Sequence, residues 1–176
     1  MNIKMAKTAE QKMELYTQRC QYILNQEMKN MLATLGSLAV EEAVNRPQSL
    51  SFYNHTGNLR SSIGYGVYRD GRKVAGGGFQ PTDAPESNGH LGIWHGRREL
   101  TKAFLGTSEI ASAKYSMGDA KFRLVVVAGM FYAGYVEAKP TKEVLAQAQL
   151  ECEMMVKPSL QQAKARIKER IARIKI

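Results

Sequence analysis

The sequence has little of what marks a membrane, secreted or disulfide-bonded protein. No apolar run approaches the roughly 18–20 residues with which a helix spans a bilayer. Residues 1–9 show neither the apolar core nor the cleavage pattern of a secretory signal, so we expect the chain to stay in the cytoplasm where it is made, without a membrane partner. The two cysteines, Cys20 and Cys152, are too few for a disulfide framework. Both lie in segments of helical periodicity, where we expect them to behave as small buried hydrophobic residues.

Residues typical of catalysis are also scarce. The chain has three histidines, His55, His90 and His95. The last two lie near Asp83 and Glu86, but neither a helical His spacing nor a Cys/His pattern supports metal binding there. No serine nucleophile elbow, Cys–His signature or paired-carboxylate motif occurs. We therefore predict no catalytic residue, no metal site, no cofactor and no enzymatic activity; a small hydrolase that uses His90 or His95 is a further alternative.

The composition that remains is that of an ordinary globular protein. Apolar residues make up 44% of the 176 residues and charged residues 23%. This length is enough for one domain with a hydrophobic core and too short for two large ones, so we predict a single domain over residues 1–176.

A long helix is predicted over residues 1–46. Thr8 and Gln11 have the spacing of a capping box, apolar residues then recur at helical intervals, and Pro47 ends the pattern. An unbroken helix of this length would reach about 50 Å, more than one small core covers, and part of it would then pack on a partner. Gly36 leaves open the alternative of two shorter helices.

A small antiparallel sheet is predicted over residues 59–137. Apolar and small residues alternate in 59–68, Asp70-Gly71 is a turn signal, and 72–75 fits a short returning strand. The clearest strand is 119–129, and we expect its extended pattern to continue to Glu137.

Two further segments complete the predicted fold. Residues 76–118 have no periodicity and form an irregular arm, in which the glycines 76–78 fit a flexible hinge better than a phosphate loop, because no Lys-Ser/Thr follows them. Residues 144–176 are predicted to be helical, with Pro158 in the first turn of a separate last helix, although the alternation at 146–153 also fits a strand. The fold class is therefore α+β, with a long N-terminal helix or helix pair, a small antiparallel sheet and a helical C-terminus.

Two motifs carry a resemblance to a known family: Thr-Gly-Asn-Leu-Arg-Ser-Ser-Ile at 56–63 and Ala-Gly-Met-Phe-Tyr-Ala-Gly-Tyr-Val-Glu at 128–137. With a long helix and a proline before them, and Lys-Pro-Ser-Leu-Gln-Gln-Ala at 157–163 after them, they resemble the minor tail-component family of long-tailed phages, the neck or tail-completion proteins. The resemblance covers roughly residues 32–165. The family usually has Gly-Thr after the glutamate, whereas this chain has Ala-Lys-Pro-Thr at 138–141.

The resemblance implies a virion structural protein at the head–tail joint, assembled in the host cytoplasm. It implies a homo-oligomeric ring, six-fold or twelve-fold, that docks on the portal, connector or head-closure protein and on the tail terminator or tail tube protein. Packaged DNA is a further candidate partner. We expect the arm 76–118 and the N-terminal helix to make these contacts.

The family motifs also give candidate interface or fold-critical residues: Gly57, Leu59, Arg60, Tyr132, Tyr135 and Glu137. Gly57 permits a backbone angle that other residues avoid, and Arg60 can pair with a carboxylate, for which Glu137 is one candidate. The tyrosines suit a core edge or an interface. Ordinary fold maintenance is the alternative role for all six.

Positive charge is concentrated at the C-terminus. The net charge is +9, and the last twenty residues hold seven Lys or Arg and one Glu. Five of these form a candidate contact surface: Lys164, Arg166, Lys168, Arg170 and Arg173. They either contact DNA phosphates or solvate the helix and pair with an acidic partner. We prefer the second interpretation because no aromatic residues are interleaved with them. The alternative function is a basic, sequence-independent nucleic-acid-binding protein that acts through this helix.

Overall fold

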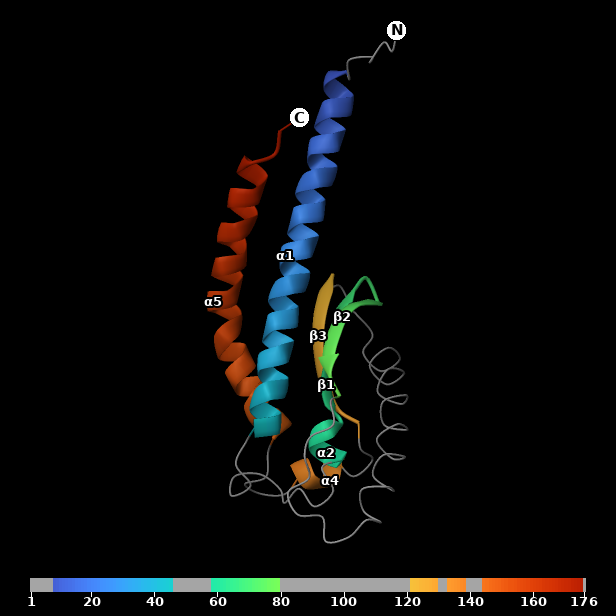
Figure 1. Cartoon of the computed structure of the whole chain (residues 1–176), viewed down its shortest axis with the longest axis vertical. Helices are drawn as coiled ribbons and strands as arrows, with labels where there is room; N and C mark the ends of the chain where they lie inside the picture. Colours follow the sequence, from blue (N-terminus) through green and yellow to red (C-terminus); the bar gives the residue numbers. More distant parts are fainter. Residues whose placement is uncertain (1–7, 46–57, 80–120, 130–132, 139–143, 176) are drawn as a thin grey trace.

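A computed structural model describes residues 8–45, 58–79, 121–129, 133–138 and 144–175. These residues form the predicted α+β fold, with two long helices and a three-stranded antiparallel sheet. Helix α1 lies in the middle of the molecule, with helix α5 along one side and the sheet along the other (Figure 1). The predicted arm lies outside the described residues beyond Phe79, as do the three histidines.

The long N-terminal helix is confirmed as α1, Ala9–Asn45, without a break. The capping box is present: the Thr8 N–H donates to Gln11 Oε1 at 3.1 Å, and the Gln11 N–H donates to Thr8 Oγ1 at 3.3 Å. Gly36 does not divide the helix, so the two-helix alternative is wrong. It is buried because the Tyr65 ring packs on it: a Cβ at Gly36 would lie 2.3 Å from the ring.

The chain enters the sheet through a short helix, α2, Asn58–Ser61, so the prediction of a strand from Leu59 is wrong at its start. A local hydrogen bond stabilises this turn: the Ser62 hydroxyl donates to the Leu59 carbonyl oxygen at 2.7 Å. Strand β1, Ile63–Arg69, follows and is buried on both of its faces.

Strands β1 and β2 form the predicted hairpin. Asp70 and Gly71 both have positive φ, 49° and 77°, which is the geometry of a tight hairpin turn. Strand β2, Arg72–Gly78, runs through the three glycines, so their interpretation as a hinge, and the start of the arm at residue 76, are wrong. The glycines give room instead: a Cβ at Gly77 would lie 2.9 Å from the Tyr65 ring.

Strand β3, Phe122–Ala128, pairs antiparallel with β1 along its whole length, which gives the order β2-β1-β3. The sheet does not continue to Glu137 as predicted. Residues Ala133–Glu137 form a short helix, α4. Alternating apolar residues fit a strand and one helical turn almost equally over five residues, which is why the pattern misled.

The C-terminus is one helix, α5, Leu145–Ala172, and the predicted separate helix beginning at Pro158 is wrong. Proline inside a helix removes one N–H donor and costs about 3 kcal/mol in isolation. Here α5 packs antiparallel on α1 both before and after this point (Figure 1). Ala148 before the proline and Ala163 after it are both buried. Packing on both sides of Pro158 therefore stabilises a continuous helix in spite of the proline.

Candidate functional site

The motif residues take different roles in the fold. Leu59 is buried in a cluster with Ala43, Ile63, Val144 and Ala148, which makes it a core residue. Tyr135, on α4, is 70% exposed. Gly57 and Tyr132 lie outside the described residues.

Arg60 lies on α2 at the edge of the core. Its side chain lines a hollow of about 300 Å³ together with Glu41 and Tyr65. Burial lowers the pKa of the Arg60 guanidinium from its ordinary value. An arginine nevertheless stays charged at neutral pH, so this hollow carries a fixed positive group.

Glu137 caps the start of α5. Its carboxylate accepts backbone N–H groups from Val144 at 3.0 Å, Leu145 at 3.2 Å and Ala146 at 2.8 Å. These N–H groups have no partner inside their own helix, and the positive end of the helix dipole favours a carboxylate. The predicted pairing of Glu137 with Arg60 stays a prediction. The role of Glu137 is to fix α4 to α5.

The basic residues of α5 divide into two groups. Arg166 and Arg170 turn toward α1, where they hold one buried carboxylate. Arg166 Nε lies 2.9 Å from Glu27 Oε2, and Arg170 Nη1 lies 2.7 Å from Glu27 Oε1. The Glu27 side chain is only 7% exposed. Hydrogen bonds from Arg166, and then from Arg170, hold the pKa of the Glu27 carboxyl below its ordinary value.

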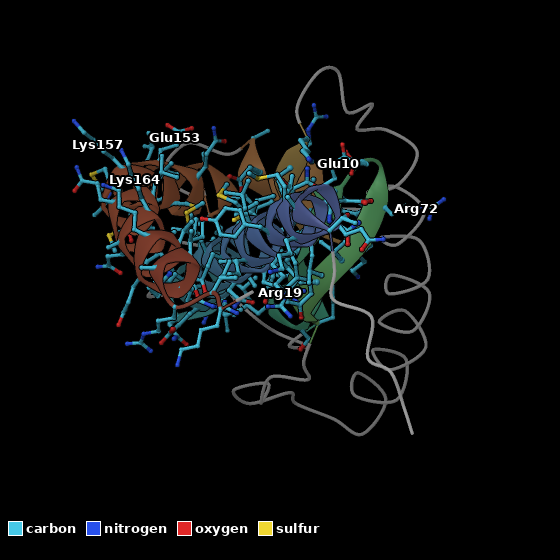
Figure 2. The ribbon with its side chains drawn as sticks, turned by 90° about the horizontal axis from the view of Figure 1, so that it is seen from above. Glu10, Arg19, Arg72, Glu153, Lys157 and Lys164 are labelled. Atoms are coloured by element: carbon cyan, nitrogen blue, oxygen red, sulfur yellow. The ribbon has the colours of Figure 1, made fainter. Side chains whose placement is uncertain are left out.

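The other basic residues lie on the surface. Arg173, which follows α5, pairs with Glu169 of its last turn, whereas Lys164 and Lys168 are exposed, as is Lys157. Lys157 and Lys164 project from the side of α5 that lies away from α1 (Figure 2). Of the five predicted contact residues, two arginines therefore belong to the helix–helix packing, and the lysines remain as the surface group.

Large apolar side chains are exposed on both long helices. On α1 these include Met13, Tyr22, Leu24 and Leu38, and on α5 they include Leu150, Met154, Met155, Val156 and Leu160. The N-terminal half of α1 extends beyond the sheet (Figure 1), and Met13 and Tyr22 lie on this half. Large exposed apolar side chains of this kind are candidates for contact with another protein.

A groove of about 430 Å³ separates α5 from the outer edge of β3. Its floor is formed by Leu32, Leu35 and Ala39 of α1, and Cys152 and Val156 lie on its α5 side. Burial raises the pKa of the Cys152 thiol, so the thiol stays protonated. Both cysteines are half-buried and free, rather than fully buried as predicted.

The part of the chain that the structure describes contains no group of three His, Cys, Asp or Glu side chains placed to hold a metal ion. Within the same part, no helix is both long and apolar enough to cross a membrane. Comparison with known proteins finds no matching family model, no matching curated protein and no matching solved structure.

Proposed function

We propose that the chain is a non-enzymatic structural subunit of a tailed-bacteriophage virion, acting at the joint between head and tail. The observation that carries the proposal is the exposure of Met13 and Tyr22, 66% and 61%, on the half of α1 that extends beyond the sheet. Such side chains favour burial against a neighbouring protein. The resemblance of the motifs at 56–63 and 128–137 to neck and tail-completion proteins supplies the class of assembly.

In this role the copies form a ring, six-fold or twelve-fold. One side of the ring docks on the portal, connector or head-closure protein, and the other side docks on the tail terminator or tail tube protein. The extending half of α1 and the segment 80–118 make these contacts, and packaged DNA passes close to the ring. The subunit acts mechanically, so binding surfaces rather than reactive groups determine its activity.

The test is deletion of the gene from its phage, followed by electron microscopy of the lysate. The expected result is DNA-filled heads beside free tails. Complementation with Tyr22→Glu should fail, because a charge replaces an exposed apolar contact, whereas the adjacent Gln21→Glu should complement. Both side chains are exposed, so neither substitution disturbs the core. Normal joined particles after deletion would overturn the proposal.

A second candidate function, sequence-independent nucleic-acid binding through α5, is favoured by one observation. Lys157, Lys164 and Lys168 are all exposed along the helix. Phosphate contacts of this kind weaken steeply as the salt concentration rises. Loss of one contact lowers the slope of log affinity against log salt concentration by about one. Duplex DNA affinity that shows this dependence, and that survives deletion of residues 80–118, would favour this function over the structural one.

A further inference from the structure

The outward face of α5 carries a continuous stripe of exposed side chains. The intervals between its members are four, three, four, three and four residues, the spacing of one face of a helix that packs on another helix. The members, all exposed, are Leu150, Met154, Lys157, Gln161, Lys164 and Lys168. We call this set the α5 stripe.

The α5 stripe is not part of the contact between α5 and α1. Helix α5 contacts α1 through the other side of its surface, where Ala148 and Ala163 are buried and Arg166 and Arg170 reach Glu27. Leu150 and Met154 are nevertheless 56% and 70% exposed. Exposing two large apolar side chains one helical turn apart has a free-energy cost that a docked surface would remove.

The two ends of the stripe are chemically opposite. Its first end is apolar, and Glu153, which is exposed, precedes Met154 in the helix. Its second end carries Lys164 and Lys168. Lysine stems cover apolar surface while their ammonium groups reach a carboxylate at the edge, so the second end is suited to pack on the first.

The stripe is also symmetric under reversal. Its intervals read the same in both directions, so turning the helix end for end places Met154 on the position of Lys164, Leu150 on that of Lys168, and Lys157 on that of Gln161. A surface with this property meets the requirement of a two-fold interface, in which residue i contacts residue j and j contacts i.

We infer that the α5 stripe binds the α5 stripe of a second copy of this chain, with the two helices antiparallel. Met154 then packs on the stem of Lys164 of the second copy, and the ammonium group of that lysine reaches Glu153. The same set of contacts occurs twice across the two-fold axis. A parallel arrangement would place lysine on lysine, which like-charge repulsion disfavours. The contact joins copies in pairs related by a two-fold axis, an arrangement distinct from a ring whose copies all face the same way. It therefore describes the free chain in solution and does not rest on the proposed role at the head–tail joint.

The test is the mass of the purified full-length chain in solution, measured by sedimentation over a range of concentrations. The wild type should form a dimer, and Glu153→Lys or Lys164→Glu alone should raise the dimer dissociation constant about tenfold. The double variant Glu153→Lys/Lys164→Glu restores the opposite charges and should return the constant to near the wild-type value. A variant that merely misfolded would not be rescued in this way.

Matched controls are available on α1. Glu14 accepts a hydrogen bond from Gln18 four residues away, as Glu153 does from Gln149, so Glu14→Lys makes the same local change outside the stripe. Lys12→Glu is the corresponding control for Lys164, because both lysines are exposed. Both controls lie on the half of α1 that is proposed to contact other virion proteins rather than a second copy of α5, so they should leave the dimer intact.

Several results would overturn the inference. These are a wild type that stays monomeric at all concentrations, an oligomer that is insensitive to the single charge reversals, and a double variant that is not restored. A monomer that binds duplex DNA, and loses it on Lys164→Glu, would also overturn it and make the stripe a nucleic-acid surface.

Discussion

Glu27 of α1 and Arg166 of α5 are 139 residues apart in sequence and meet at 2.9 Å between Oε2 and Nε. Arg170 reaches the other carboxylate oxygen at 2.7 Å. The carboxylate is buried and both of its oxygens are occupied, so these contacts fix how far α5 slides along α1. Met31, Leu35 and Ala163 pack nearby and form the apolar part of the same contact.

Glu27→Gln should destabilise the fold by about 1–2 kcal/mol, because a neutral amide replaces a carboxylate that accepts two charged hydrogen bonds. The measurement is the free energy of unfolding by urea at neutral pH. Glu14→Gln is the control, since Glu14 is exposed and accepts only from Gln18 among the described contacts. An equal effect of the two substitutions would show that the buried ion pair contributes nothing.

The contribution of Glu27 should depend on pH. Its pKa in the folded protein is lowered from the ordinary value of 4.5, so the stabilisation is fully present above that value and is lost as the pH falls through the lowered pKa. The difference in unfolding free energy between wild type and Glu27→Gln should therefore be constant from pH 7 to about 5 and shrink at more acid pH. A difference that stays constant down to the acid limit would contradict the assignment.

Glu137→Ala should fray the start of α5 and cost about 1–2 kcal/mol, as loss of a capping residue does. Hydrogen exchange should accelerate at the amides of Val144, Leu145 and Ala146 and not at mid-helix amides. Glu137→Gln keeps one acceptor oxygen and should lose less. Glu151→Ala, within α5 itself, is the control. Equal exchange rates at these three amides in both alanine variants would rule out the cap.

Gly36→Ala should destabilise the protein even though alanine favours helix by about 1 kcal/mol. The added methyl group would lie 2.3 Å from the Tyr65 ring, which must then move away from Ser37, its hydrogen-bond partner at 3.2 Å. We expect a loss of about 1–3 kcal/mol in thermal or urea unfolding. Gly134→Ala meets nothing within 4 Å and should be neutral or stabilising. A stabilising Gly36→Ala would contradict the close packing of α1 on β1.

Local signals in the sequence predicted local structure well. Thr8 with Gln11 predicted the start of α1, and Asp70-Gly71 predicted the hairpin, because neighbouring residues determine both features. The predictions based on Pro158 and Gly36 were wrong, because packing against a neighbouring element outweighs the low intrinsic helix propensity of both residues.

The candidate site was predicted less completely, because its contacts join distant segments. The sequence showed the run of positive charge in α5, but its division into arginines that pair with Glu27 and lysines that have no such role depends on Glu27, which no nearby residue indicates. The positions of Glu27, Arg166 and Arg170 in the sequence do not indicate that the three side chains meet. The cap by Glu137 was missed for the same reason, since its partners belong to another helix.

The central proposal places this chain at the joint between head and tail, and imaging purified virions by electron cryomicroscopy tests it most directly. We expect density at the joint that fits the antiparallel pair of α1 and α5, in every copy of a closed ring. Mass spectrometry of the same particles should detect the chain. Particles that carry normal heads and tails but lack the chain would contradict the proposal.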